Sequence, residues 1–241
     1  GLSPRPTARS PDSAQAERPA PPARPGAAPR EAGGGWVALP PGTPARIGDR
    51  VTCSIEGSLE WEGPEAGAPN LLLPVCPTEA VVGEPGRLPP GWWQVLPEGV
   101  SWCVSATGRD FGVPFVELHY RGVAPAQSQI TVRFGCREEA LGVKRLWLEA
   151  PWRLAAGTLP ASCSALLVLG RHGADGAYRD TLTVQMPRPQ AMNMVGQRPA
   201  AGFEESEGRV LPGVALWFTR EEGVDFRLRL GAAGLWPAVR L

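Results

Sequence analysis

The densest cluster of polar side chains with ligand-binding chemistry lies in a Gly-rich segment, residues 170–180, which reads GRHGADGAYRD. His172, Asp175, Tyr178 and Asp180 offer nitrogen and oxygen ligands, and the glycines allow the backbone to turn. A calcium loop needs several carboxylates at alternating positions and a closing bidentate acid. Because only two carboxylates are present, we predict a solvated hairpin connection with Tyr178 buried where the next strand begins. The four side chains remain candidate binding residues, and we expect no metal and no cofactor.

Nucleophilic catalysis would require a serine or cysteine beside a histidine. The chain has only His119 and His172, and strand alternation places His119 on the same face as Glu117 and Arg121, which indicates a solvated face. The nucleophile-elbow, phosphate-loop and dinucleotide-loop motifs are all missing from the sequence. The pattern favours a non-enzymatic protein, with a small β-fold hydrolase or an inactive enzyme-derived domain as the alternative.

The nine tryptophans are the other candidate binding groups. Tryptophan fills β-sheet cores, and it also forms contact surfaces for sugars and proteins. Trp92 and Trp93 are adjacent in an expected strand and so face opposite ways, which leaves one of them free to be exposed. If the exposed one joins Trp61 in a patch, we expect that patch to bind a protein or a glycan.

Five cysteines occur without any C-x-x-C pair, and the two histidines are far apart, so the spacing predicts no zinc site. Each cysteine lies in or beside an apolar segment, as buried free thiols do. The alternative is up to two disulfides with one thiol left over, which would imply an oxidising compartment. The sequence leaves both possibilities open.

Short runs of alternating apolar and polar residues predict the strands that position these groups. Residues 50–56 and 58–62 alternate on either side of Gly57 and predict a hairpin. Turn signals every 8–15 residues separate further expected strands, at 92–96, 100–106, 115–120, 129–134, 145–148, 165–169 and 181–186. This spacing is typical of an all-β sandwich or barrel of many short antiparallel strands. Only residues 137–141 favour a helical turn.

The chain divides into four expected parts. Residues 1–35 hold eight prolines, eight alanines and no aromatic residue, which predicts a disordered arm that tethers the protein or docks on a partner. Residues 36–188 form the all-β domain, and residues 189–208 are a linker or long loop. In residues 209–241, two alternating runs, 214–219 and 224–230, flank a four-residue loop and predict a C-terminal hairpin. An isolated hairpin is marginal in water, so we expect it to pack on the main domain or on a partner.

The composition limits the possible functions. The 24 basic and 24 acidic residues cancel, so no overall field attracts nucleic acid, and no apolar run is long enough for a membrane helix. Thirty glycines and 28 prolines argue against a helical protein, while a hydrophobic content of 43% is too high for disorder throughout. We therefore predict an extracytoplasmic or secreted β-domain that binds protein or glycan, or that serves as a structural assembly component. A viral structural or accessory protein is also compatible with this composition.

Three short segments resemble parts of known β families. Residues 176–185 resemble the closing strand of secreted pilin and spore-coat domains, and residues 169–185 look like the loops of dUTPase-related barrels. Residues 48–63 are similar to the opening hairpin of calcium-dependent galactose-binding lectin domains. The Ser-rich phosphate loop and the catalytic Asp context of the dUTPase-related family are not both present, and the Asp/Asn-rich calcium loop of the lectin family is missing. These resemblances therefore assign no residue a role.

Overall fold

The computed structural model describes residues 50–53, 59–137, 145–204 and 208–240. The chain divides into the units Gly1–Leu39 and Pro40–Leu241, and every described residue belongs to the second. The predicted arm at 1–35 and most of the predicted helical turn at 137–141 lie outside the described residues. Within them the regular structure is strands, apart from the 3₁₀ turn η1 (Pro77–Glu79), which confirms the all-β prediction. No helix in this part of the chain is long and apolar enough to cross a membrane.

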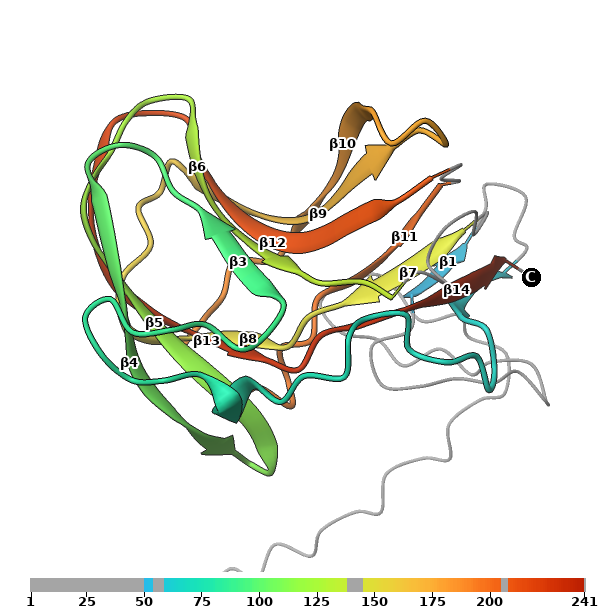
Figure 1. Ribbon diagram of the computed structural model, residues 1–241, viewed down its shortest axis with the longest axis horizontal. Helices are drawn as coiled ribbons and strands as arrows, with labels where there is room; N and C mark the ends of the chain where they lie inside the picture. The colour runs from blue at the N-terminus through green and yellow to red at the C-terminus, as the bar shows by residue number, and fades with distance from the viewer. Residues whose placement is uncertain (1–49, 54–58, 138–144, 205–207, 241) are drawn as a thin grey trace, which may run out of the picture. The chain divides into compact units, whose positions relative to one another are not determined.

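Three antiparallel sheets make up the fold (Figure 1). The β3 sheet has the strand order β10 (Tyr178–Met186), β9 (Cys163–His172), β12 (Val210–Phe218), β6 (Ser128–Phe134) and β3 (Trp92–Val95). The β5 sheet has the order β4 (Val100–Asp110), β5 (Val113–Ala124), β13 (Glu222–Gly231) and β8 (Trp152–Gly157). The β7 sheet has the order β1 (Arg50–Cys53), β2 (Leu59–Pro64), β14 (Gly234–Arg240), β7 (Leu146–Glu149) and β11 (Ala200–Phe203).

The core of this sandwich-like fold forms because each strand turns one apolar face inward. In β13, Phe226, Leu228 and Leu230 are almost fully buried, while Arg227 and Arg229 alternate with them on the other face. The inward residues of β5, β6, β9 and β12 belong to the same continuous apolar cluster. Burial of this shared surface is the main contribution that holds the β3 and β5 sheets together.

The seven strands expected between residues 92 and 186 are all present, several of them longer than predicted. The predicted pairing of residues 50–56 with 58–62 is confirmed where it is described, since Val51 lies opposite Trp61. Strands β8, β11 and β14 are not among those expected, and β11 lies inside the segment expected to be a linker or long loop.

The prediction of a C-terminal hairpin is wrong in its pairing. β12 pairs with β9 and β6, whereas β13 pairs with β5 and β8, so the short 219–221 connection passes from one sheet to the other. Alternation specifies which face of a strand is buried, but it does not specify the partner strand. Both strands occupy central positions, which allows each to bury its apolar face in the common core.

Candidate functional site

The Gly-rich segment forms the β9–β10 hairpin, and its two carboxylates serve the turn itself. Asp175 accepts a hydrogen bond from the Ala177 N–H at 3.1 Å and pairs with Arg179 at 3.1 Å. Asp180 pairs with Arg171 at 2.6 Å, and this hydrogen bond lowers the pKa of the Asp180 carboxyl. Neither carboxylate is left to bind a cation, in keeping with a hairpin connection rather than a calcium loop.

The prediction that Tyr178 is buried is wrong, because its side chain is 61% exposed. The register between β9 and β10 shifts between Tyr178 and Asp180, and this bulge turns the phenol outward. The ring packs edge-on against His172 with centroids 5.8 Å apart, and its hydroxyl lies 2.9 Å from the Thr181 hydroxyl. His172 Nδ1 lies 3.0 Å from the Gly176 carbonyl oxygen. The two aromatic side chains therefore lie together at the hairpin end of the β3 sheet.

Trp92 and Trp93 face opposite ways, as alternation requires. Trp92 packs edge-on against Phe134 with centroids 4.7 Å apart, while Trp93 on the outer face is 36% exposed. Trp61 lies on β2, in a different sheet from β3, and its side chain is outside the described residues. A patch that combines Trp61 with Trp93 therefore stays a prediction.

The outer face of the β3 sheet, on the side opposite the β5 sheet, is concave because the ends of its strands curve toward that side (Figure 1). Register and alternation place its residues in rows across the five strands. One row contains Trp93, Arg133, Gly213, Val168 and Thr183. The next contains Val95, Thr131, Ala215, Leu166 and Gln185. A shorter row at one end contains Gln129, Trp217 and Ser164. A shorter row at the other end contains Leu211, Gly170 and Thr181. We call these residues together the concave face.

Two small residues of the central strand β12 face the middle of the concave face. Gly213 and Ala215 lie on the central strand β12, while Trp93 and Gln185 lie on the edge strands. A Cβ on Gly213 would meet the Val132 carbonyl oxygen at 2.3 Å, so only glycine fits there. This distribution of side-chain size adds to the concavity of the backbone.

Two indoles on the concave face are separated widely enough to contact different parts of one extended ligand. Trp217 lies four residues along β12 from Gly213, which itself shares a row with Trp93. Strand geometry puts the Cα atoms of Trp93 and Trp217 roughly 17 Å apart. Sequence reasoning missed Trp217, because neither its alternation nor its type distinguishes it from the tryptophans in the core.

The remaining groups of the concave face are mainly hydrogen-bonding side chains. They include hydroxyls and amides on three strands: Gln129, Thr131, Ser164, Thr181, Thr183 and Gln185. Thr131 is 1% exposed, and within the described part of the chain its hydroxyl has no hydrogen-bond partner. Asp180 is the one carboxylate in these five strands, and it faces the opposite side in its pair with Arg171.

Arg133 lies near the centre of the concave face, in the row between Trp93 and Gly213. Its Nη1 donates a hydrogen bond to the Leu211 carbonyl oxygen at 2.6 Å. Burial lowers the pKa of the guanidinium, and the nearby Tyr178 hydroxyl partly offsets that effect.

The outer face of the β5 sheet is not the solvated face that the sequence predicted around His119. Glu117 is only 4% exposed and accepts a hydrogen bond from Arg229 at 2.8 Å. Asp110 is also buried and lies 2.6 Å from Arg153. Arginine side chains from β13 and β8 cover these carboxylates, a pairing that alternation in one strand does not reveal. Both acids are committed to ion pairs.

The described cysteines are free thiols: Cys76, Cys103, Cys136 and Cys163. None of these four cysteines forms a disulfide, so the alternative of paired cysteines does not hold for them. Cys53 has no described side chain. Among the described residues, no three His, Cys, Asp or Glu side chains form a group that could hold a metal ion.

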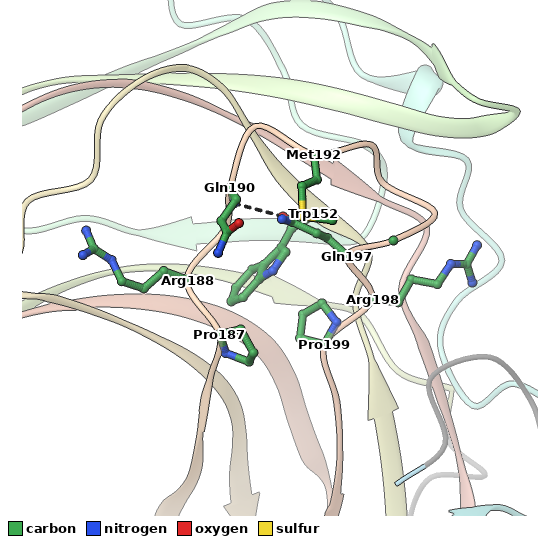
Figure 2. Close-up of a pocket in the computed structure, with 9 residues that line it drawn as sticks. Trp152, Pro187, Arg188, Gln190, Met192, Gln197, Arg198 and Pro199 are labelled. Atoms are coloured by element: carbon green, nitrogen blue, oxygen red, sulfur yellow. Dashed lines mark hydrogen bonds between the residues drawn. The ribbon is translucent and has the colours of Figure 1, made fainter. Parts of the chain in front are cut away.

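A separate pocket of about 250 Å³ lies under the loop that connects β10 to β11 (Figure 2). Trp152 forms its base, with Pro187 and Pro199 on either side. The Trp152 backbone N–H donates to the Gln197 carbonyl oxygen at 3.0 Å, and the Gln190 backbone N–H donates to the Gln197 side-chain oxygen at 3.0 Å. The loop thereby covers the free edge of β8.

The charged groups at the rim of this pocket are engaged elsewhere. Arg198 pairs with Glu149 at 2.8 Å. Arg188 donates to the carbonyl oxygens of Leu159 and Pro160. These contacts hold the loop in place, so the pocket offers fewer free polar groups than the concave face does.

No protein-family model matches the sequence, and no curated protein matches it. Among solved structures, the chain is similar to the CBM22-1 xylan-binding domain from Paenibacillus barcinonensis Xyn10C, at 16% identity and a TM-score of 0.43, over 71% of this chain and 97% of that one. It is also similar to the family 11 carbohydrate-binding module of Lic26A-Cel5E from Clostridium thermocellum, at 9% identity and a TM-score of 0.41, over 71% and 96% of the two chains. A third similar structure is TmCBM61 in complex with β-1,4-galactotriose, at 11% identity and a TM-score of 0.29, over 61% and 89%.

Proposed function

We propose that this protein is a non-enzymatic glycan-binding β-domain whose ligand lies along the concave face. The observation that carries this proposal is the presence of Trp93 and Trp217 on one curved sheet face, together with a set of uncharged hydrogen-bonding side chains. Of the two ligand classes that the sequence predicts, protein and glycan, these side chains favour a glycan.

The chemistry of the concave face matches that of a sugar chain. A sugar ring has an apolar face of C–H groups, which packs against a flat indole, and a rim of hydroxyls, which both donate and accept hydrogen bonds. Amide and hydroxyl side chains such as Gln129 and Thr183 have the same dual capacity. Two indoles roughly 17 Å apart would contact separate rings of one chain.

Hydrolysis at this face is not supported. Glycoside hydrolysis ordinarily uses two carboxyl groups on either side of the bond that is cleaved. None of the concave-face residues is an acid, and the buried acids Asp110 and Glu117 lie in ion pairs on the other sheet. Binding without bond cleavage is therefore the activity that these side chains favour.

A protein partner, an extracytoplasmic location and a tethering role for residues 1–35 remain predictions from the sequence. The free thiols of the four described cysteines remove the disulfide argument for secretion. The location is therefore proposed from the glycan-binding role alone.

The test is binding of the full chain to a panel of insoluble and soluble polysaccharides, neutral and acidic, by depletion and by affinity electrophoresis. We expect at least one polysaccharide to bind and the double variant Trp93→Ala/Trp217→Ala to lose that binding while keeping its melting temperature within a few degrees. Phe111→Ala is the matched control, since Phe111 is an exposed aromatic residue, 77% accessible, at the β4–β5 turn. Binding that survives the double variant, or no binding to any member of the panel, would overturn the proposal.

A further inference from the structure

Arg133 differs from three other partly buried arginines, Arg153, Arg229 and Arg198, in having no acidic partner among the described residues. Arg153, Arg229 and Arg198 have side chains 20%, 23% and 34% exposed, and each has a carboxylate oxygen within 2.8 Å. Arg133 bonds only the Leu211 carbonyl oxygen, and among the described residues no carboxylate lies within ion-pair distance of it.

A partly buried guanidinium without a counter-charge is energetically unfavourable. Burial removes hydration that a charged group needs, and a hydrogen bond to one neutral carbonyl restores only part of it. The lowered pKa of Arg133 reflects this cost, whereas the hydrogen bond with Asp180 raises the pKa of Arg171 despite some opposing desolvation. An arriving anion would supply the missing charge.

The position of Arg133 makes it accessible to a ligand on the concave face. It shares a row with Trp93 and is adjacent to Gly213, the residue that has no side chain to cover it. The Leu211 bond uses one of the five N–H donors of a guanidinium, and the others can hold a carboxylate in the two-point geometry that arginine favours. Since no concave-face residue is acidic, nothing on this face repels a negatively charged sugar.

We propose that Arg133 is the subsite for the carboxylate of an acidic sugar, so that the preferred ligand is a uronate-containing glycan. This assignment rests on the glycan-binding function proposed above and names the substrate class of the same face. Trp93, in the same row, would stack on the ring whose carboxylate Arg133 binds, or on the ring next to it.

The test compares three forms of one uronate-containing oligosaccharide by isothermal titration calorimetry: the free carboxylate, the methyl ester and the carboxyl-reduced neutral sugar. We expect the wild-type chain to bind the carboxylate form at least tenfold more tightly than either neutral form. Arg133→Gln is expected to bind all three forms alike, at the affinity that the wild type shows for the neutral ones. Arg133→Lys should recover only part of the preference, because lysine cannot form the two-point contact.

Arg227→Gln is the matched control, because it removes one positive charge from the outer face of the other sheet, where the arginine side chain is 48% exposed. It should leave the carboxylate preference unchanged, and melting temperatures confirm that each variant is folded. Equal wild-type affinity for all three forms would overturn the Arg133 assignment while leaving glycan binding intact. A sulfated oligosaccharide is titrated in the same way, and tighter binding of it than of the uronate would overturn the carboxylate assignment. No binding of any glycan would overturn both proposals.

Discussion

Trp92 and Trp93 allow the binding role and the structural role of tryptophan to be separated in adjacent residues. Trp93→Ala removes an indole from the concave face, and Trp92→Ala removes one from the core side of the same edge strand. If the concave face binds the ligand, the first variant changes affinity and the second changes stability.

The expected loss of affinity follows from the exposed area of Trp93. Its exposed fraction is 36%, which for a side chain of roughly 250 Å² leaves about 90 Å² for a sugar ring to cover. At about 25 cal/mol per Å², covering that area contributes at most about 2 kcal/mol, or up to about fortyfold in Kd. We expect Trp93→Ala to weaken binding about 10- to 40-fold and to alter unfolding free energy by less than about 1 kcal/mol.

The opposite result is expected for Trp92. Its ring packs on Phe134 and against the apolar core, so removal leaves a cavity that costs about 2–4 kcal/mol. For a domain of this size that cost lowers the melting temperature by about 5–10 °C. The affinity of the folded variant for the glycan should change by less than about threefold, because the Trp93 surface remains.

Isothermal titration calorimetry and thermal unfolding of the two variants and the wild type make this comparison. Wild-type affinity in Trp93→Ala, together with lost affinity in a Trp92→Ala variant that is still folded at the assay temperature, would refute ligand binding at the concave face. That pattern would place the ligand on another surface.

Two further predictions concern the ionisation of two cysteine thiols and of the Asp180 carboxyl. Burial raises the pKa of Cys136 and of Cys163 to about 12, so at pH 8 each thiolate is roughly a thousandfold scarcer than in an exposed thiol. Mass spectrometry after iodoacetamide treatment should show both unmodified in the native chain and modified after denaturation, and rapid native labelling of either would contradict this. The pair with Arg171 lowers the folded-state pKa of Asp180, so its stabilisation is present above roughly pH 4 and is lost as the pH falls further. Urea midpoints measured from pH 5 to pH 2 should therefore fall more steeply for the wild type than for Asp180→Asn, and parallel curves would show that the pair does not contribute.

Local sequence patterns predicted the strands and their faces well, since alternation is a property of each strand alone. The apolar face of residues 224–230 and the opposite orientations of Trp92 and Trp93 follow from the sequence in this way. The pairing of the strands does not follow from the sequence in this way. The neighbours of β12 and β13 are distant in the chain, and burial in the common core determines which strands pair.

The candidate site could be predicted only in part, for the same reason. Trp93, His172 and Tyr178 were expected to be binding residues, and the structure places all three on or beside the concave face of one sheet. Arg133 and Trp217 were missed, because their significance depends on cross-strand neighbours. Those neighbours, such as Leu211 for Arg133 and Gln129 for Trp217, lie about 80 to 90 residues away in the sequence. No local motif marks a concave sheet face.

The most direct test of glycan binding at the concave face is a nuclear magnetic resonance titration of the ¹⁵N-labelled full chain. An oligosaccharide that the protein binds is added stepwise, and the indole N–H signals of the tryptophans are followed. If the ligand lies on the concave face, the signals of Trp93 and Trp217 shift with one common Kd, while those of Trp102 and Trp152 do not move. Shifts confined to Trp152, at the base of the separate pocket, would contradict the account and place the ligand under the β10–β11 loop.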